Sequence, residues 1–281
     1  MLRTRFAPSP TGHLHIGNAY SALMCQQWAE KHHARLLLRI EDIDHTRCRQ
    51  NFIDDMLEDL RWLGLRWQGE PLKQSQRMQA YNQALDTLKT LGVLYPCFCT
   101  RKQIQAEIAR MGVAPHHDDA ADPYPGTCRN RKLGPANDTF SWRLDIAKAY
   151  ALIGKEIAWK DGKGHLHPVR PQFHGDVVLG RKDIGVSYHL AVCVDDAEQC
   201  ITHVIRGADL KYSTGIHCLL QALLQLPSPT YIHHELLLDN HGQRLAKRHH
   251  APTLRALRAE GMDPGNLREA LLSRSNVRWG T

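Results

Sequence analysis

The segment RFAPSPTGHLHIGN at residues 5–18 decides the fold that we expect for this chain. Residues 3–7 have the length of a short strand, which the turn residues at 8–12 end. Residues 16–31 carry apolar side chains at helical spacing, and RLLLRI at 35–40 is an apolar run of strand length. A strand, a helix and a second strand in this order form a βαβ unit, which predicts a parallel sheet.

The rest of the chain supplies further helices and strands. Apolar periodicity predicts helices at 51–62, 75–91, 209–226, 253–259 and 267–272. Gly92 is expected to stop the second of these helices. Apolar runs at 191–194 and 201–205 are predicted as buried strands. The pattern indicates an α/β protein with a core built on a parallel sheet.

Residues 97–175 interrupt this rhythm and predict an inserted α+β subdomain. A short helix is expected at 102–111, followed by strand candidates at 140–144, 157–159 and 165–169. We therefore expect the core to be split around the insertion. The expected parts are residues 1–96 and 176–240 as the two halves of the core, 97–175 as the inserted subdomain, and 241–281 as a short helical C-terminal part.

Composition and charge narrow the class of protein. The chain has 281 residues, of which 42% are hydrophobic and 23% charged, as in ordinary folded domains. No apolar run is long enough to span a membrane, and no apolar region follows the first arginines as in a secretory signal. We therefore expect a cytoplasmic protein with no membrane partner.

The positive charge is concentrated near the C-terminus. The formal net charge is +7, and residues 241–281 contain eight Lys or Arg against three Asp or Glu. Such a segment is either a solvated helical face or a surface for nucleic acid, and charge alone leaves both open.

The turn between the first strand and the first helix is a candidate ligand site. Ligands of parallel sheets bind at the carboxyl ends of strands, and a helix N-terminus suits a phosphate. Gly12 and Gly17 allow close approach to the backbone, and His13 and His15 can donate hydrogen bonds to phosphate oxygens. The spacing alone also fits a structural turn with incidental histidines.

Three cysteines form a candidate metal site. Cys97, Cys99 and Cys128 supply three thiols, and zinc favours four nitrogen or sulfur ligands in a tetrahedron. The candidates for the fourth ligand are Tyr124, His116, His117 and Asp118. Reduced packing cysteines are the alternative.

Two motifs resemble the signatures of class I aminoacyl-tRNA synthetases. His15-Ile-Gly-Asn18 resembles the HIGH signature, and residues 5–12 are similar to the glutamyl and glutaminyl branch. RLAKR at 244–248 resembles the KMSKS loop, with Ala246 in place of the usual Ser and Asn18 in place of the last His of HIGH. The resemblance implies a Rossmann-like, parallel-sheet nucleotide-binding core. It implies that ATP, with Mg²⁺, is bound there by His15, Gly17, Asn18 and Lys247. It also implies that His15 and Lys247 are catalytic, with Lys247 neutralising charge as pyrophosphate leaves.

The resemblance also implies a glutamate pocket and a structural zinc ion. Arg5, Glu41, Tyr188 and Arg206 lie at or near expected strand ends, and arginine suits a carboxylate. In the family these positions, together with Ser9, bind glutamate. A short synthetase-like family binds one zinc ion through CxC and YxxxC, which here are Cys97, Cys99, Tyr124 and Cys128.

Only 33 residues follow Arg248, whereas full glutamyl-tRNA synthetases carry an anticodon-binding region there. The chain therefore resembles the glutamyl-Q tRNA(Asp) synthetases, a family of stand-alone catalytic cores. This resemblance implies activation of L-glutamate by ATP without tRNA, and its transfer to queuosine in the anticodon loop of tRNA(Asp). We expect a monomer whose basic C-terminal segment contacts RNA phosphates. The alternatives are a truncated glutamyl-tRNA synthetase that charges a tRNA 3′ end and a catalytically inactive RNA-binding paralogue.

Overall fold

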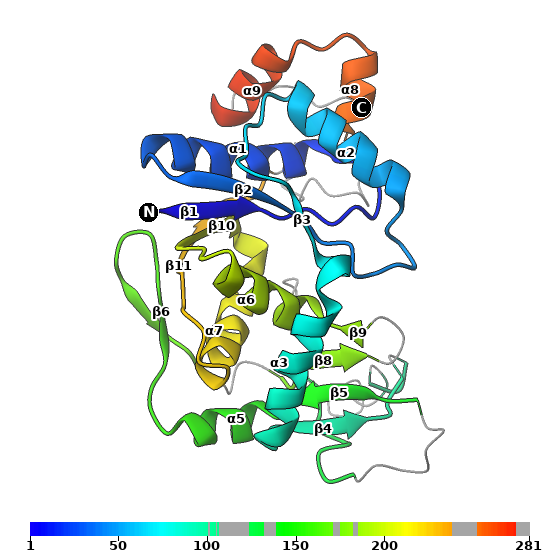
Figure 1. Cartoon of the computed structure of the whole chain (residues 1–281), viewed down its shortest axis with the longest axis vertical. Helices are drawn as coiled ribbons and strands as arrows, with labels where there is room; N and C mark the ends of the chain where they lie inside the picture. Colours follow the sequence, from blue (N-terminus) through cyan, green and yellow to red (C-terminus); the bar gives the residue numbers. More distant parts are fainter. Residues whose placement is uncertain are drawn as a thin grey trace. The chain divides into compact units, whose positions relative to one another are not determined.

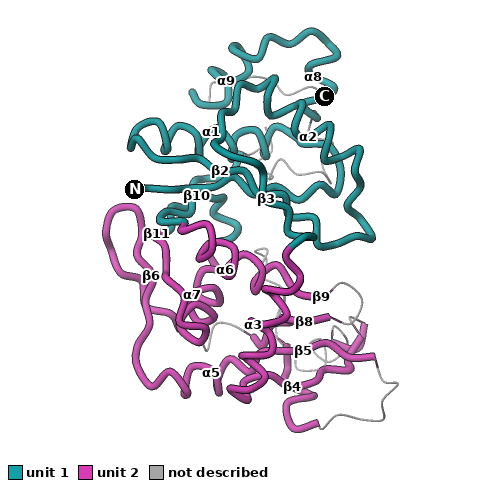
Figure 2. Tube along the Cα trace, in the orientation of Figure 1, with its two compact units in different colours: residues 1–76, 201–210, 231–281 teal, residues 77–200, 211–230 magenta. Residues whose placement is uncertain are grey.

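A computed structural model describes residues 1–100, 102–104, 106, 124–131, 139–170, 175–181, 185–237 and 252–273. The chain divides into two compact units, which Figure 2 colours separately. Met1–Gln76, Ile201–Leu210 and Tyr231–Thr281 make up the first unit, and Arg77–Cys200 with Lys211–Thr230 make up the second. Each unit is built from segments that are far apart in the sequence.

The first unit contains the expected βαβ arrangement (Figure 1). Strand β1 (Arg3–Phe6), helix α1 (Ile16–Lys31) and strand β2 (Arg35–Ile40) follow one another, and β3 (Leu72–Lys73) completes the sheet order β1-β2-β3. Both strand pairs are parallel, with Arg5 opposite Leu37 and Ile40 opposite Lys73. The α/β fold with a parallel sheet is thereby confirmed.

Strand β10 (His203–Gly207) lies beside β1 and pairs with β11 (Thr230–His234). The amide of Thr202 donates to the carbonyl of Arg3, and the amide of Arg3 donates to the Thr202 hydroxyl at 2.9 Å. A segment 200 residues along the chain is thus fixed against the first strand.

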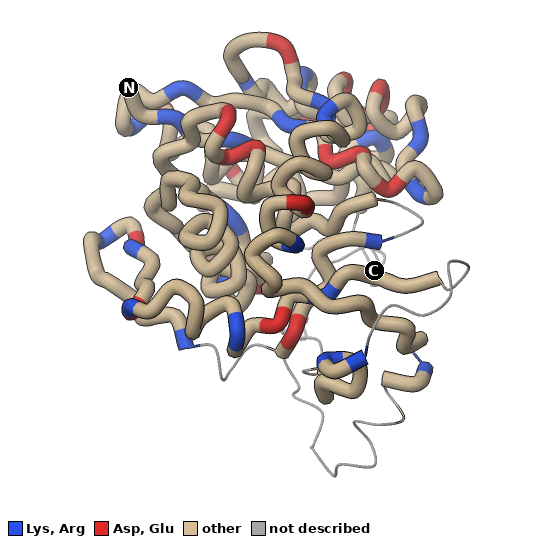
Figure 3. Tube along the Cα trace, turned by 60° about the horizontal axis from the view of Figure 1, so that its bottom comes forward, with Lys and Arg blue, Asp and Glu red and all other residues tan. Residues whose placement is uncertain are grey.

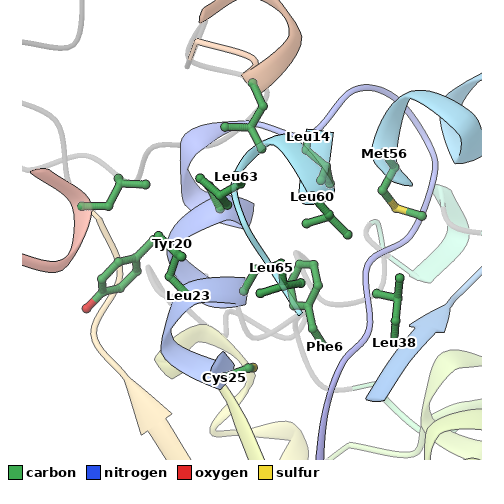
Figure 4. Packing of buried hydrophobic residues seen from close by; sticks show 14 of the residues in the cluster. Phe6, Leu14, Tyr20, Leu23, Cys25, Leu38, Met56, Leu60, Leu63 and Leu65 are labelled. Carbon is green, nitrogen blue, oxygen red and sulfur yellow. The ribbon is translucent and has the colours of Figure 1, made fainter. Parts of the chain in front are cut away.

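The core of the first unit lies between the sheet and its helices. Figure 4 shows residues from β1, α1, β2 and α2 (Gln50–Trp62) packed together, among them Phe6, Leu23, Leu38 and Met56. Helices α8 (Leu254–Ala259) and α9 (Pro264–Ser273) add buried leucines to the same cluster. Each fully buried aliphatic side chain contributes about 1.5–3 kcal/mol, so the C-terminal helices are held mainly by packing.

The second unit is built around an antiparallel sheet. Its order is β4 (Leu94–Cys97), β5 (Ser141–Leu144), β8 (Val178–Arg181) and β9 (Gly185–Val186). A separate hairpin pairs β6 (Ala158–Lys160) with β7 (Leu166–Pro168). This unit contains the helices α3 (Met78–Thr90), α5 (Ile146–Ile153), α6 (Tyr188–Glu198) and α7 (Ser213–Leu223). Two short 3₁₀ helices complete the description: η3 (Ala208–Leu210) belongs to the first unit, and η1 (Gln74–Arg77) ends on the first residue of the second.

A buried carboxylate joins α3 to α6. Asp195 accepts hydrogen bonds from Arg77 Nε and from the hydroxyl of Tyr81, each at 2.8 Å. Asp195 and Tyr81 are both fully buried, so the charge is paired rather than left alone in the core. This contact fixes α6, whose first residue is Tyr188.

The structure corrects one element of the sequence analysis. Residues 191–194 were expected to form a buried strand, but they lie inside helix α6. Residues 191–193 are buried and residue 194 is half-buried, and a short apolar run without periodicity fits a buried helix as well as a strand. The other expected helices are confirmed within a few residues, and Gly92 follows α3 with φ 68°. The expected helix at 102–111 is described only at 102–104 and 106, which are helical.

Among the described helices, none combines the length and the apolarity that crossing a bilayer would require.

Candidate active site and metal centre

His15 forms the N-cap of α1. Its Nδ1 accepts a hydrogen bond from the amide of Gly17 at 3.1 Å, and its own amide donates to Asn18 Oδ1 at 3.2 Å. These two bonds make a reciprocal capping box, with Asn18 in the part that Glu or Gln usually plays. Because Nδ1 is the acceptor, the proton of the neutral ring lies on Nε2, which is then a donor. The departure at Asn18 thus has a structural use in this chain.

The segment around His15 pairs with the segment that precedes α8. The amide of Leu254 donates to the carbonyl of Leu14 at 2.8 Å, and the amide of Ile16 donates to the carbonyl of Pro252 at 3.2 Å. His15 and Thr253 are therefore partners in an antiparallel bridge. Lys247, which precedes Pro252 by five residues, lies outside the described residues, and its role stays a prediction.

Arg5 and Arg206 lie on neighbouring strands of the first unit. Both are buried, each with 4% of its surface exposed. The sulfur of Cys25 lies 3.6 Å from the carbonyl oxygen of Arg5 and 3.5 Å from that of Ile205. Cys25 therefore contacts β1 and β10 at the same point, where Arg5 and Ile205 lie close together. Burial raises the pKa of the Cys25 thiol to about 12, which keeps it a neutral donor to these carbonyls.

Two aromatic rings of β11 hold the guanidinium of Arg206. Its Nε donates to His233 Nε2 at 3.4 Å, and its central carbon lies 5.1 Å from the ring centroid of Tyr231. The rings of Tyr231 and His233 are nearly parallel. Such stacking against a ring face stabilises a buried cation and fixes the plane of the guanidinium.

Ser9 and Glu41 come together at the ends of β1 and β2. The hydroxyl of Ser9 donates to Glu41 Oε2 at 3.4 Å, and the amide of Glu41 donates to the carbonyl of Pro8 at 3.0 Å. The structure thus brings Arg5, Ser9, Glu41 and Arg206 to strand ends of one unit, with anionic and cationic groups both present. That combination suits a ligand with an ammonium and carboxylates.

Tyr188 belongs to the second unit and begins helix α6, whereas the sequence analysis expected it before a strand. The ring of Tyr188 lies edge-on to those of His189 and His217, with centroids 5.6 Å apart in both cases. The two histidines are themselves joined, with His189 Nδ1 3.1 Å from His217 Nε2. The place of Tyr188 in the glutamate pocket stays a prediction.

The cysteine residues of the predicted zinc site come together in the second unit. The sulfurs of Cys97, Cys99 and Cys128 all lie within 4.8 Å of one another, and Cys99 and Cys128 are 3.5 Å apart. The hydroxyl of Tyr124 lies 3.4 Å from Cys97 Sγ and 3.3 Å from Cys99 Sγ. Sulfurs bound tetrahedrally to zinc at about 2.3 Å are spaced by about 3.8 Å, so these donors fit such an ion.

The close packing of the cluster shifts the pKa values of its thiols in different directions. Burial raises the pKa of Cys99 to about 11. Burial opposes ionisation of Cys128 as well, but hydrogen bonds, chiefly from Tyr124, lower its pKa to about 7. One thiol of the set is thus ready to lose its proton near neutral pH. His116, His117 and Asp118, the other candidates for the fourth ligand, lie outside the described residues.

Two residues that the sequence analysis missed support this cluster. The guanidinium of Arg143 lies 3.8 Å from the ring centroid of Tyr124 and donates to the carbonyl of Asp176 at 2.7 Å. The carboxylate of Asp176, itself buried, accepts from Arg129 Nε at 2.6 Å and from the hydroxyl of Tyr95. The sequence signal for Asp176 was a single acid two residues before strand β8.

The C-terminal segment is less basic where it is described. Residues 252–273 contain three Lys or Arg and three Asp or Glu, so its positive excess lies outside the described residues. Arg255 and Arg258 of α8 pair with acids of α2. Figure 3 shows acidic and basic positions interspersed along the traced chain. In the described part, these arginines stabilise the fold rather than forming a separate basic face.

Comparisons with known proteins agree with this geometry. Residues 1–278 match the family model of the class I tRNA synthetases (E and Q), catalytic domain. The chain is 44% identical over 276 residues to a glutamyl-Q tRNA(Asp) synthetase of Rhodobacter capsulatus, covering 95% of this chain and 99% of that protein. A protein with the same name from Nitratidesulfovibrio vulgaris is 40% identical, covering 95% and 84% of the two chains.

Among solved structures, a glutamate tRNA ligase from Elizabethkingia meningosepticum, in complex with its amino acid, is similar with a TM-score of 0.76 and 26% identity. That likeness covers 96% of this chain and 60% of the ligase. The chain therefore belongs to the class I tRNA synthetases of the glutamate and glutamine type, matched at their catalytic domain, and is an ATP-dependent ligase of that family.

Proposed function

We propose that this chain activates L-glutamate with ATP to glutamyl-adenylate in the absence of tRNA, and then transfers the glutamyl group to queuosine in the anticodon loop of tRNA(Asp). The observation that carries the proposal is the set of Arg5, Ser9, Glu41 and Arg206 at strand ends of the unit in which His15 caps α1. The names of the relatives at about 40% identity support the choice of acceptor.

In the first step a carboxylate oxygen of glutamate attacks the α-phosphorus of ATP, and pyrophosphate leaves. Such a transfer depends mainly on positioning and on stabilising negative charge. His15 donates from Nε2 to the phosphates, beside Gly17 and Asn18, and Lys247 neutralises the charge on the leaving group. Mg²⁺ accompanies the nucleotide.

The same proposal assigns Tyr188 to the binding of glutamate. Arg5 and Arg206 bind carboxylates of the substrate, Glu41 binds its ammonium, and Ser9 orients Glu41 through their hydrogen bond. In the second step a nucleophile of the queuosine base attacks the acyl carbon of the adenylate, and AMP leaves.

A structural zinc ion bound by Cys97, Cys99, Tyr124 and Cys128 belongs to the same proposal. When bound, the ion would cross-link β4 to the turn at 124–131, with no part in the reaction itself. All eight cysteines are free thiols, which suits function in the reducing cytoplasm. We propose that the chain acts there as a monomer.

The test has two parts. ATP–pyrophosphate exchange should depend on glutamate and proceed without RNA. Labelled glutamate should then enter tRNA(Asp) that contains queuosine and not a transcript of the same tRNA that lacks it. Labelling of the transcript would instead indicate charging of the 3′ end, and absence of exchange in zinc-loaded protein would indicate an inactive paralogue.

A further inference from the structure

Helix α2 carries three acids on one face, at positions 55, 58 and 59, where helical spacing places side chains next to one another. We call Asp55, Glu58 and Asp59 the α2 acidic face. Arg255 and Arg258 of α8 approach it: Arg255 Nη1 lies 2.7 Å from Asp55 Oδ2, and Arg258 Nη1 lies 2.5 Å from Glu58 Oε1. The two ion pairs join the same two helices.

Only the first of these pairs also reaches the segment before α1. The same oxygen of Asp55 that binds Arg255 lies 3.3 Å from His13 Nδ1, an ion pair when the imidazole is protonated. The ring of His13 meets that of Phe52 edge-on, with centroids 5.1 Å apart. Phe52 and Asp55 are three residues apart on α2, so one patch of this helix holds His13.

The backbone bridge between His15 and Thr253 lies between these contacts. His13 is two residues before His15, and Arg255 is two residues after Thr253. The bridge itself consists of the hydrogen bonds of Leu254 and Ile16, each of which contributes only about 1 kcal/mol. Asp55 Oδ2 is therefore hydrogen-bonded to Arg255 on one strand of the bridge and lies 3.3 Å from His13 Nδ1 on the other. Each partner is two residues from a centre residue of the bridge.

We propose that Asp55 is a positioning residue for the ATP site, which fixes the register of segments 14–16 and 252–254 through His13 and Arg255 and so holds His15 in place. The inference rests on the proposed adenylation only for its kinetic readout. Glu58 provides the matched control, because its pair with Arg258 joins the same helices without contact to His13 in the described structure.

The experiment compares Asp55→Asn and Glu58→Gln with wild type. In ATP–pyrophosphate exchange, D55N should lower kcat roughly tenfold, because small displacements of a positioned group cost that much or more. The KM for glutamate should change less than twofold, and D55E should recover part of kcat. E58Q should leave both constants unchanged. If Asp55 had a merely structural role, D55N would instead change the KM values for glutamate and ATP together, or change neither.

Hydrogen exchange gives a readout that needs no activity. In D55N the amides of Ile16 and Leu254 should exchange at least several-fold faster than in wild type, whereas E58Q should not change them. If D55N fails to fold, Arg255→Gln removes the other partner of the ion pair from a half-exposed position. Where both variants fold, the effects of D55N and R255Q on kcat should not be additive in the double variant. Unchanged amide exchange and a kcat within twofold of wild type would overturn the inference. If the wild type showed no ATP–pyrophosphate exchange, the proposed function would be contradicted. Hydrogen exchange of the amides would then still test whether Asp55 positions the bridge.

Discussion

His15 and Thr253 face each other in an antiparallel bridge, and each is the N-cap of a helix, His15 of α1 and Thr253 of α8. The hydroxyl of Thr253 accepts from the amide of Ala256, as His15 accepts from Gly17. Two helices from opposite ends of the chain thus begin at one point. The pairing ties residues 252–254, which follow the second motif, to residues 14–16 of the first motif, more than 220 residues earlier in the chain.

Lys247 is the residue on which ATP activation should depend most. Lys247→Ala should lower the rate of glutamate-dependent ATP–pyrophosphate exchange by about 10²–10³-fold, the usual loss when one stabiliser of transition-state charge is removed. Lys247→Arg keeps the charge and should lose less. Both variants should unfold at the wild-type temperature. An exchange rate for K247A within threefold of wild type would show that the loop takes no part in the chemistry.

Glu41 should decide how tightly glutamate binds. Glu41→Gln removes the anion that the substrate ammonium needs but keeps the size of the side chain and its bond to Ser9. We expect the KM for glutamate to rise at least tenfold, since a charge-assisted hydrogen bond contributes about 1.5–3 kcal/mol, whereas the KM for ATP should stay constant. Glu30→Gln, on the exposed end of α1, is the matched control and should change neither. A selective rise in the KM for ATP would place Glu41 on the nucleotide instead.

The fold was predictable where the sequence carried a period. The βαβ unit and the helices of α2, α3, α8 and α9 follow from apolar spacing, and Gly92 ends α3 as expected. The approach was wrong for residues 191–194, because this stretch of α6 is a short apolar run and the acids that follow it, Asp195 and Asp196, are themselves buried. Strand β3, two residues long, was not predicted, because its pairing with β2 comes from tertiary contact and not from a local pattern.

The sequence suggested candidate residues for the site but not the contacts that these residues make. Motif resemblance suggested His15, Arg5, Glu41 and Arg206 as candidates. No sequence pattern indicated that His233 would accept from Arg206 or that Asp176 would accept from Arg129. Such partners are chosen by which strands lie side by side. A single buried acid such as Asp176 looks the same in sequence as an exposed one.

The metal centre should contribute to stability. If zinc is bound, a chelator should lower the melting temperature of the wild type, and elemental analysis should find one zinc ion per chain. Cys99→Ser should abolish both the zinc content and the effect of the chelator, because loss of one ligand destroys a closed tetrahedral site. Cys200→Ser is the control, since Cys200 is an exposed free cysteine outside the cluster.

The fourth ligand can be tested in the same assay. Tyr124→Phe removes only the hydroxyl that lies beside Cys97 and Cys99, so it should lower the zinc content without the larger packing loss of an alanine. Full zinc content in Y124F would assign the fourth position to another group, with His116→Ala and His117→Ala as the next variants.

Asp59 should make stability depend on pH between about 4 and 6. Its side chain is fully buried, and burial raises its pKa to about 6, while Arg258 acts in the opposite direction. In the unfolded chain the carboxyl ionises near pH 4. Between these values the folded chain holds more protons than the unfolded chain at this residue, so the free energy of unfolding falls as pH rises. The stabilising contribution is complete below pH 4 and is lost as pH rises through 6.

Asp59→Asn does not titrate, so its stability relative to wild type should rise by on the order of 2 kcal/mol from pH 4 to pH 6 and then stay constant. Urea unfolding at constant ionic strength measures this difference. Asp54→Asn, on the exposed side of α2, controls for the loss of one charge from the helix, and a D59N curve that follows the D54N curve would contradict the buried assignment.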